Sequence, residues 1–532
     1  MTTDALAIVK LIVALAGMLF LLCPESLLEG RLPASTRQTL RRRVFIGLGI
    51  AGALSWFAEP MLHKPQDSNF ATVRWFHAWD TYHYYIGAKY FEELGYEDLY
   101  NATVVADFEN GYRAPAQERW IRDLRTNELV PTETILRRAE QYKNLFSADR
   151  WQEFRHDIDY FRGVYKELLV PWSHVKRDHG FNATPTWSFL GSAVANTGPI
   201  TDSKITALVL IDFILLFIMW CIVWRTFGLE VCCVSLLFWG TSQQSSYAWT
   251  SASLLRFDWL LWSVCGICSL KQGRFFTSGF LLAYATLLRI FPGVMIGALG
   301  LKVLIDLVRK RDLRVPASAQ RFALGALVAL CVLLPLSTVA SGRSWNVWNE
   351  FYANSAKHLE SPAANALGLK SVLSYASESA WVNVIQLDVS TPNTTSITKP
   401  PETLWKEARE RVFERRKGLF ALATVAFLVL LGLSIRHLEW WKAAVLGIGT
   451  IAFALTLSGY YYVLFLAFGF LSGEKKIVGV ALCALAASTN LVFLVYSAGE
   501  LSYITTSLAA IAFAALATSL FVRRATARQD IA

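Results

Sequence analysis

Five long apolar stretches are the feature that most limits how this chain can fold. They cover residues 205–224, 322–340, 419–435, 477–495 and 504–522. Each reaches the length of about 17–25 residues that a helix needs to cross the hydrocarbon core of a bilayer. Of the 532 residues, 54% are hydrophobic and only 17% are charged, whereas soluble domains carry about 25% charged residues. The chain is therefore expected to be an integral membrane protein.

Shorter or more polar apolar stretches are further candidates for membrane spans. They lie near residues 6–23, 44–57, 231–247, 254–270, 275–290, 294–308, 443–457 and 461–471. Several of them fall short of the length of about 20 residues that a span usually has. We expect an all-α polytopic membrane protein with about 11–13 transmembrane helices.

The distribution of Lys and Arg predicts how the chain is oriented. With thirteen spans, every basic cluster falls on one face of the membrane, which the positive-inside rule makes cytoplasmic. The clusters are at residues 31–43, 225, 271–274, 309–321, 436–442, 475–476 and 523–528. The net charge of +10 is thus explained by membrane topology and requires no nucleic-acid partner.

Two long polar segments, 61–201 and 341–417, then lie outside the cytoplasm. The first is rich in Trp and Tyr, too aromatic for a disordered segment, so we expect it to fold as a small helical domain on the outer membrane surface. The predicted organisation is two N-terminal spans (1–60), this first outer domain (61–201), central spans (202–340), a second outer loop (341–417) and C-terminal spans (418–532).

The most informative segment is RWFHAWDTYHYYIGAKYFEELGYEDLY, residues 74–100. Its composition favours an amphipathic helix from Asp80 to Leu94 at headgroup level, ended by Gly95. Asp80 would then lie at the outer edge of the membrane, flanked by His77 and His83. An Asp near a helix start is also commonly a cap or first-turn residue, so a structural role remains the alternative.

The segment resembles the first-loop signature of the GT-C superfamily of glycosyltransferases, in particular the polyprenyl-phosphate-sugar-dependent mannosyltransferase branch. The matching residues are Asp80, Tyr84, Tyr85, Gly87, Ala88, Gly95, Leu99 and Tyr100. The resemblance implies a GT-C-like helix bundle with a helical first outer loop, and it makes Asp80 the catalytic base. His77, His83 and Tyr84 become candidate substrate-binding residues. The chain differs in having an extra span before the usual first one and an unusually long first loop.

A sugar carried on a lipid phosphate requires a base for the acceptor hydroxyl and cations for the departing phosphate. Arg256 and Asp258 occur in SLLRFDW at the outer start of a predicted span, and Arg289 in TLLRIFPG at the outer end of another. Charges at membrane depth usually face a cavity, a partner or a ligand. A structural pair of Asp258 with either arginine is the alternative.

Further candidates lie in the outer segments. Asp178 and His179, in KRDHGFNATPTW, could line a sugar pocket with Trp187 as a stacking platform, or form a structural turn. In the second outer loop, the stretch with His358 and Lys370 resembles the acceptor-side or phosphate-contacting loop of the same family.

The sequence offers no convincing metal site. It has no HExxH motif, and Asp157 and Asp159, which are two residues apart, lie on a predicted helix and so face different directions. Fixed cations can stabilise a phosphate leaving group without a metal. We therefore expect that no metal or other cofactor is required.

Together these features predict an inverting glycosyltransferase that transfers mannose or a pentose from a polyprenyl-phosphate donor to a lipid or glycan hydroxyl. The expected location is a bacterial inner membrane, with the site facing the periplasm or cell exterior. A multi-span transporter is the main alternative, motivated by Asp212 and the other charges at membrane depth, although no internal repeat is visible. Another membrane group-transfer enzyme would require an activated nucleophile and would give a product of different mass.

Overall fold

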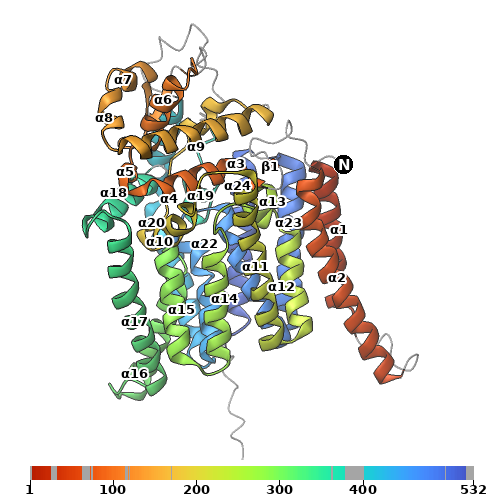
Figure 1. The fold of residues 1–532 in the computed structure, drawn as a ribbon. Helices are drawn as coiled ribbons and strands as arrows, with labels where there is room; N and C mark the ends of the chain where they lie inside the picture. The colour runs from red at the N-terminus through yellow and green to blue at the C-terminus, as the bar shows by residue number, and fades with distance from the viewer. Residues whose placement is uncertain are drawn as a thin grey trace, which may run out of the picture.

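The structure is a computed structural model and describes residues 3–24, 33–62, 72–73, 76–113, 118, 120–168, 170–360, 364–377, 401–497 and 499–522. Across these ranges the chain is almost entirely helical, and its strands form three short two-stranded antiparallel sheets. Figure 1 shows a bundle of roughly parallel helices with a smaller helical layer covering one end.

Six helices are long and apolar enough to cross a membrane. They are α1 (Thr3–Leu22), α11 (Asp202–Phe227), α17 (Ala317–Ala340), the part Leu404–Ile435 of α20 (Pro401–Ile435), α23 (Lys476–Tyr496) and α24 (Glu500–Ser519). Five of them coincide with the five long apolar stretches of the sequence. Large apolar side chains also face outward from the bundle, with Phe217 71% and Leu422 67% exposed, as lipid-facing positions require. An all-α membrane protein is thus confirmed at this level, and the count of 11–13 spans stays a prediction.

The shorter apolar stretches also form helices, with some differences from the sequence expectation. They correspond to α2 (Ala34–Leu62), α12 (Leu229–Thr241), α14 (Asp258–Lys271), α15 (Phe275–Leu288), α16 (Gly293–Lys310), α21 (Trp440–Gly447) with α22 (Thr450–Ala454), and the 3-10 helix η8 (Gly459–Gly473). The stretch expected to start near residue 254 becomes helical only at Asp258. Ala252 and Leu255 have positive φ angles of 60° and 49°, which are incompatible with a right-handed helix.

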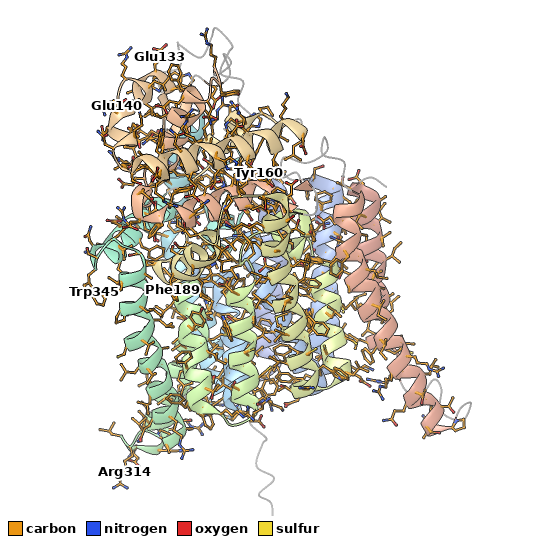
Figure 2. The ribbon with its side chains drawn as sticks, viewed as in Figure 1. Glu133, Glu140, Tyr160, Phe189, Arg314 and Trp345 are labelled. Carbon is orange, nitrogen blue, oxygen red and sulfur yellow. The ribbon has the colours of Figure 1, made fainter. Side chains whose placement is uncertain are left out.

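The helical layer at one end of the bundle is formed by described residues of the first predicted outer segment, from β1 to α10, and is called the outer layer below (Figure 1). It contains β1 (Thr72–Val73), β2 (Phe76–His77), α3 (Ala78–Thr81), the π-helix η3 (Tyr82–Ile86), α4 (Gly87–Lys89), α5 (Phe91–Leu94), α6 (Leu99–Glu109), β3 (Trp120–Asp123), β4 (Glu128–Pro131), α7 (Thr132–Leu136), α8 (Ala139–Lys143), α9 (Ala148–Glu167), the 3-10 helix η5 (Trp172–Arg177) and α10 (Pro185–Ala195). Figure 2 shows Glu133 and Glu140 in this layer and Arg314, from a predicted cytoplasmic cluster, at the opposite end of the molecule.

The second outer segment and the remaining connections between bundle helices contain further helices and two short strands. They are η6 (Gln243–Ser245), α13 (Tyr247–Thr250), α18 (Asn346–Glu360), β5 (Ala366–Leu367), α19 (Leu369–Leu373) and β6 (Leu457–Ser458), which pairs with β5.

The helix expected from Asp80 to Leu94 is not continuous. It is divided among α3, the π-helix η3, α4 and α5, and it breaks at Tyr90, whose φ is −114°. Gly95 ends α5 with a φ of 54°, so the expected C-cap is confirmed. The π-helical turn is typical of functional sites, because it widens the helix and redirects its side chains.

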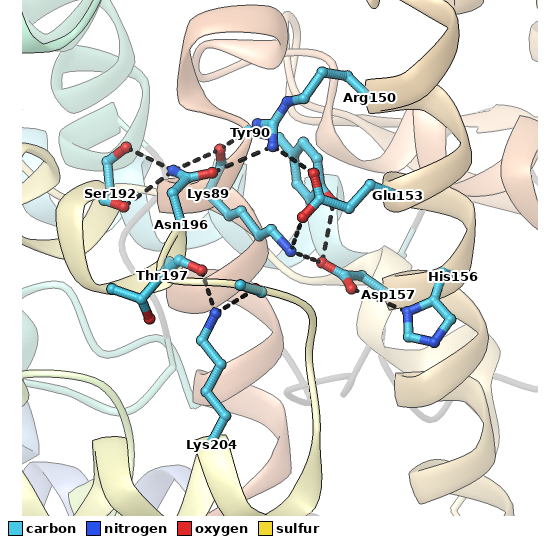
Figure 3. Close-up of polar contacts among 12 residues, drawn as sticks. Lys89, Tyr90, Arg150, Glu153, His156, Asp157, Ser192, Asn196, Thr197 and Lys204 are labelled. Carbon is cyan, nitrogen blue, oxygen red and sulfur yellow. Dashed lines mark hydrogen bonds and ion pairs between the residues drawn. The ribbon is translucent and has the colours of Figure 1, made fainter.

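A buried ion cluster fixes this segment to the rest of the outer layer (Figure 3). The ammonium of Lys89 is fully buried and lies 2.6 Å from Asp157 and 2.7 Å from Glu153, both on α9. The carbonyl of Lys89 accepts hydrogen bonds from Arg150 at 2.8 Å and from Asn196 at 3.2 Å. These contacts hold the helices that follow Asp80 between α9 and the end of α10.

The N-terminal helix α1 also contributes to the interior. The Lys10 ammonium lies 2.8 Å from the Glu59 carboxylate on α2, and both side chains are buried. The same carboxylate accepts a hydrogen bond from the backbone N–H of Tyr247 at 3.0 Å. Helix α1 is therefore tied to the connection that leads toward Arg256.

Glycines allow the closest helix contacts in the bundle. A Cβ atom on Gly279 of α15 would overlap the backbone carbonyl of Phe322 on α17, and one on Gly325 would overlap that of Phe276. Small residues at helix crossings let backbones approach closely, which is a main source of helix association in membranes. The sequence positions of these glycines thus set the separation of α15 and α17.

We expect Gly279→Leu to destabilise the protein by about 1–3 kcal/mol, because the side chain forces α15 and α17 apart. Thermal unfolding in detergent measures the effect. The control is Gly297→Leu, since a Cβ there meets no atom within 4 Å. Equal melting temperatures for the two variants would contradict the close packing.

His174, in the 3-10 helix η5, gives the outer layer a pH dependence. Burial, together with the charge of Arg177, lowers the pKa of His174 from 6.5 to about 4. The unfolded chain then binds a proton that the folded chain does not, so stability is lost as the pH falls from 6.5 toward 4.

We expect the melting temperature to fall between pH 7 and pH 4.5, and His174→Gln to make this decline shallower. The contribution is on the order of 1–2 kcal/mol, because the ring is partly solvated and its charge partly screened. Melting curves of both proteins across this range test the expectation, and parallel declines would refute it.

Candidate active site

Asp80 lies in the first turn of α3, directly after the strand β2. His77 caps this turn, because its Nδ1 accepts a hydrogen bond from the Asp80 backbone N–H at 3.1 Å. The backbone N–H of His77 donates to the Ala252 carbonyl at 2.8 Å. His77 thus orients the Asp80 carboxylate and ties the outer layer to the loop before α14, which is a positioning role.

The Asp80 carboxylate is paired with Arg256. Its Oδ2 lies 3.0 Å from Nη2 of Arg256, and the two side chains are 17% and 5% exposed. Arg256 follows α13 in the loop 251–257, whereas Asp80 belongs to the outer layer. The ion pair therefore joins the two parts of the fold at the predicted catalytic carboxylate.

A buried carboxylate of α11 holds the loop that presents Arg256. Asp212 accepts hydrogen bonds from the backbone N–H groups of Arg256 at 3.0 Å and Phe257 at 3.2 Å. The indole of Trp187 donates to the carbonyl of Leu255 at 3.1 Å. These bonds stabilise the left-handed backbone of the loop and direct the Arg256 side chain toward Asp80.

Aromatic rings surround the two arginines. The Arg256 guanidinium carbon lies 5.0 Å from the ring centre of Tyr84 and 5.2 Å from that of Tyr460. Arg289 lies 5.5 Å from the Tyr84 ring and 5.9 Å from that of Trp187. One tyrosine ring thus contacts both cations, which brings Arg256 and Arg289 to one place with Asp80, as the sequence predicted.

Arg289 and Asp258 each present an unused polar atom. Nη1 of Arg289 donates to the Leu288 carbonyl at 2.9 Å, but its Nη2 is buried with no hydrogen-bond partner among the described residues. Oδ1 of Asp258 accepts from the Trp259 backbone at 2.6 Å, and its Oδ2 is likewise unpaired within the described ranges. Leaving such buried groups unpaired is costly, so both atoms are candidates to bind a polar ligand.

Asp178 and His83 belong to a neighbouring network that secures the loop before α10. Asp178 accepts from the Trp79 indole at 2.7 Å, while the His83 ring contacts the Trp79 carbonyl at 2.8 Å and the Tyr100 hydroxyl at 2.6 Å. Burial opposes ionisation of Asp178, but the charges of His83 and His179 and the bond from Trp79 outweigh it and lower its pKa. The network lies directly beside the Asp80 turn.

The sequence-predicted residues therefore fall into groups. Asp80, Tyr84, Arg256 and Arg289 come together, and Asp258 lies at the start of α14 close behind them. His77, His83 and Asp178 support the turn and the adjacent loop, and His179 follows Asp178 in that loop. Lys370 packs over the ring of Phe413 on α20, at 5.0 Å. The side chain of His358, on α18, lies outside the described residues.

Two residues contribute to the site without having been predicted to do so. Tyr460 was assigned no role from the sequence, and Asp212 was named only as a charge at membrane depth that would suit a transporter. The sequence did contain a signal for Asp212, because a carboxylate within an apolar span is energetically unfavourable unless it has a partner. Its partners are backbone N–H groups, which no residue pattern reveals.

Neither a metal-ligand group among the described residues nor a similar known protein identifies the function of the site. Across the parts of the chain that the structure describes, no three His, Cys, Asp or Glu side chains are grouped so that they could hold a metal ion. No protein-family model, curated protein or solved structure significantly matches this chain.

We expect Asp212→Asn to destabilise the loop 251–257, because an amide replaces one acceptor oxygen with a donor that faces a backbone N–H. The expected cost is about 1–3 kcal/mol in thermal unfolding. Asp202→Asn, at the exposed start of the same helix, is the matched control. If both variants melt together, Asp212 does not anchor the loop.

Proposed function

We propose that the protein is an inverting glycosyltransferase of the GT-C kind that uses a polyprenyl-phosphate sugar as donor. The observation that carries the proposal is the grouping of one partly exposed carboxylate, Asp80, with two buried guanidinium groups, Arg256 and Arg289. The group lies where the outer layer meets the helix bundle. A lipid-linked sugar placed there would have its lipid in the bilayer and its phosphate near the cations.

The reaction needs the two functions that these side chains can perform. Asp80 accepts the proton of the acceptor hydroxyl, whose oxygen forms a bond to the anomeric carbon of the sugar. The bond from that carbon to the phosphate oxygen breaks, and its electron pair leaves with the polyprenyl phosphate. General-base catalysis contributes about 100- to 10,000-fold to such a step.

The arginines act on the leaving group. The donor phosphodiester carries one negative charge, whereas the departing phosphate monoester can carry two. Arg256 and Arg289 therefore bind the transition state more strongly than the ground state, which is what lowers the barrier. Tyr84 lies against both cations and Trp187 against Arg289, so the two rings provide aromatic surface next to the charges. We propose that no metal or cofactor is required, because these fixed cations perform the role.

The resemblance of the segment 74–100 favours mannose or a pentose as the sugar and a lipid or glycan hydroxyl as the acceptor. The location of the basic clusters opposite the outer layer supports a site on the extracytoplasmic side, and we propose a bacterial inner membrane as the setting. The transporter alternative is weakened, because the carboxylate of Asp212 is engaged in holding a loop.

Asp80→Asn in purified protein should reduce sugar transfer from a synthetic polyprenyl-phosphate mannose or pentose by about 100- to 10,000-fold. The product is identified by mass, since a sugar and an acyl group add different masses. Asp202→Asn should retain wild-type transfer. Undiminished transfer by Asp80→Asn would refute the role of Asp80.

A further inference from the structure

Among the described residues, the ion pair of the Arg256 guanidinium is with Asp80, the proposed base, whereas the carboxylates of Asp212 and Asp258 act on its charge from farther away. Its stem is fixed, since Asp212 holds the backbone N–H of the same residue at 3.0 Å. Tyr84 and Tyr460 lie against it at 5.0 and 5.2 Å. The guanidinium end of the side chain is therefore the part whose partner can change during a reaction.

The guanidinium of Arg256 lies 3.0 Å from Oδ2 of Asp80, so it occupies one of the two carboxylate oxygens that the acceptor hydroxyl has to reach. That oxygen becomes accessible to the hydroxyl only when Arg256 moves away. Arg289 is differently placed: Nη1 donates to a backbone carbonyl at 2.9 Å, and the structure records no ion pair between it and a described carboxylate. Before the reaction the two arginines thus have different partners, although both can bind the leaving phosphate.

The charges of the proposed reaction identify the task of Arg256. As the proton arrives, Asp80 changes from one negative charge to none, while the phosphate changes from one negative charge to two. One unit of negative charge thus passes from the carboxylate to the leaving group. A cation that can reach both will follow it.

We infer that Arg256 is a transferable cation, paired with Asp80 before the reaction and with the departing lipid phosphate after it. Arg289 holds the phosphate throughout. When Asp80 later loses its proton to water, it attracts Arg256 back and weakens the hold on the lipid phosphate, which promotes its release. This inference rests on the proposed function, and it adds an order of events to that site.

The test uses two probes with the same lipid: farnesyl phosphate, which can carry two charges, and its methyl phosphodiester, which carries one. Asp80→Asn mimics the protonated base. In detergent-solubilised protein at pH 8, this variant should bind farnesyl phosphate roughly tenfold more tightly than wild type. The gain for the diester should be much smaller, about threefold or less.

Loss of the Asp80 charge alone would also strengthen the binding of an anionic lipid. The experiment must therefore show that the gain in binding depends on Arg256. We expect the gain to disappear when Asp80→Asn is combined with Arg256→Gln and compared with Arg256→Gln alone. An equal gain in both backgrounds, or an equal gain for the two probes, would overturn the inference. Asp80→Ala and Arg256→Met give the same cycle if one of the first variants does not fold.

Sugar transfer by the wild-type protein, measured in parallel, separates this inference from the proposed function. Transfer without a gain in binding by Asp80→Asn overturns the inference and leaves the proposed function standing. Absence of transfer overturns the proposed function, and absence of farnesyl phosphate binding by every variant overturns the inference. Asp202→Asn should bind both probes as the wild type does.

Discussion

The ion pair between Asp80 and Arg256 is the contact on which the site depends. The carboxylate comes from a short helical turn of the outer layer, and the guanidinium from a loop between two helices of the bundle. At 3.0 Å the pair joins the two parts of the fold, and under the proposed function it marks the place where donor and acceptor meet. Other features of the fold contribute by keeping these two side chains in place.

Each partner has its own support. His77 caps the turn of Asp80 and hydrogen bonds to the loop of Arg256, while the Lys89 cluster fixes the following helices against α9. Asp212 holds the Arg256 loop from inside the bundle. Buried charges are costly unless they are paired or satisfied by hydrogen bonds, and in this protein their partners lie on different elements. The charged groups thus define the relative position of the outer layer and the bundle.

Much of this arrangement could be predicted from the sequence, because apolar length and costly charges are local signals. The long spans, the helical outer segment and the candidates Arg256 and Arg289 follow from these signals, and Asp80 follows from the resemblance of the segment 74–100. The π-helical turn, the late start of α14 at Asp258 and the role of Tyr460 were not, since they arise from tertiary contacts. Asp212 shows the limit most clearly: its residue type indicated a partner, but that partner is backbone. The role of His77 as a cap was hidden for the same reason.

The central claim is that Asp80, Arg256 and Arg289 form the site where a lipid-phosphate sugar reacts. The most direct measurement is an experimental structure of the protein with a non-transferable phosphonate analogue of a polyprenyl-phosphate sugar. The account predicts phosphonate oxygens within hydrogen-bond distance of Arg256 and Arg289, the lipid between bundle helices and the sugar next to Asp80. An analogue bound elsewhere, with the pair of Asp80 and Arg256 unchanged, would contradict it.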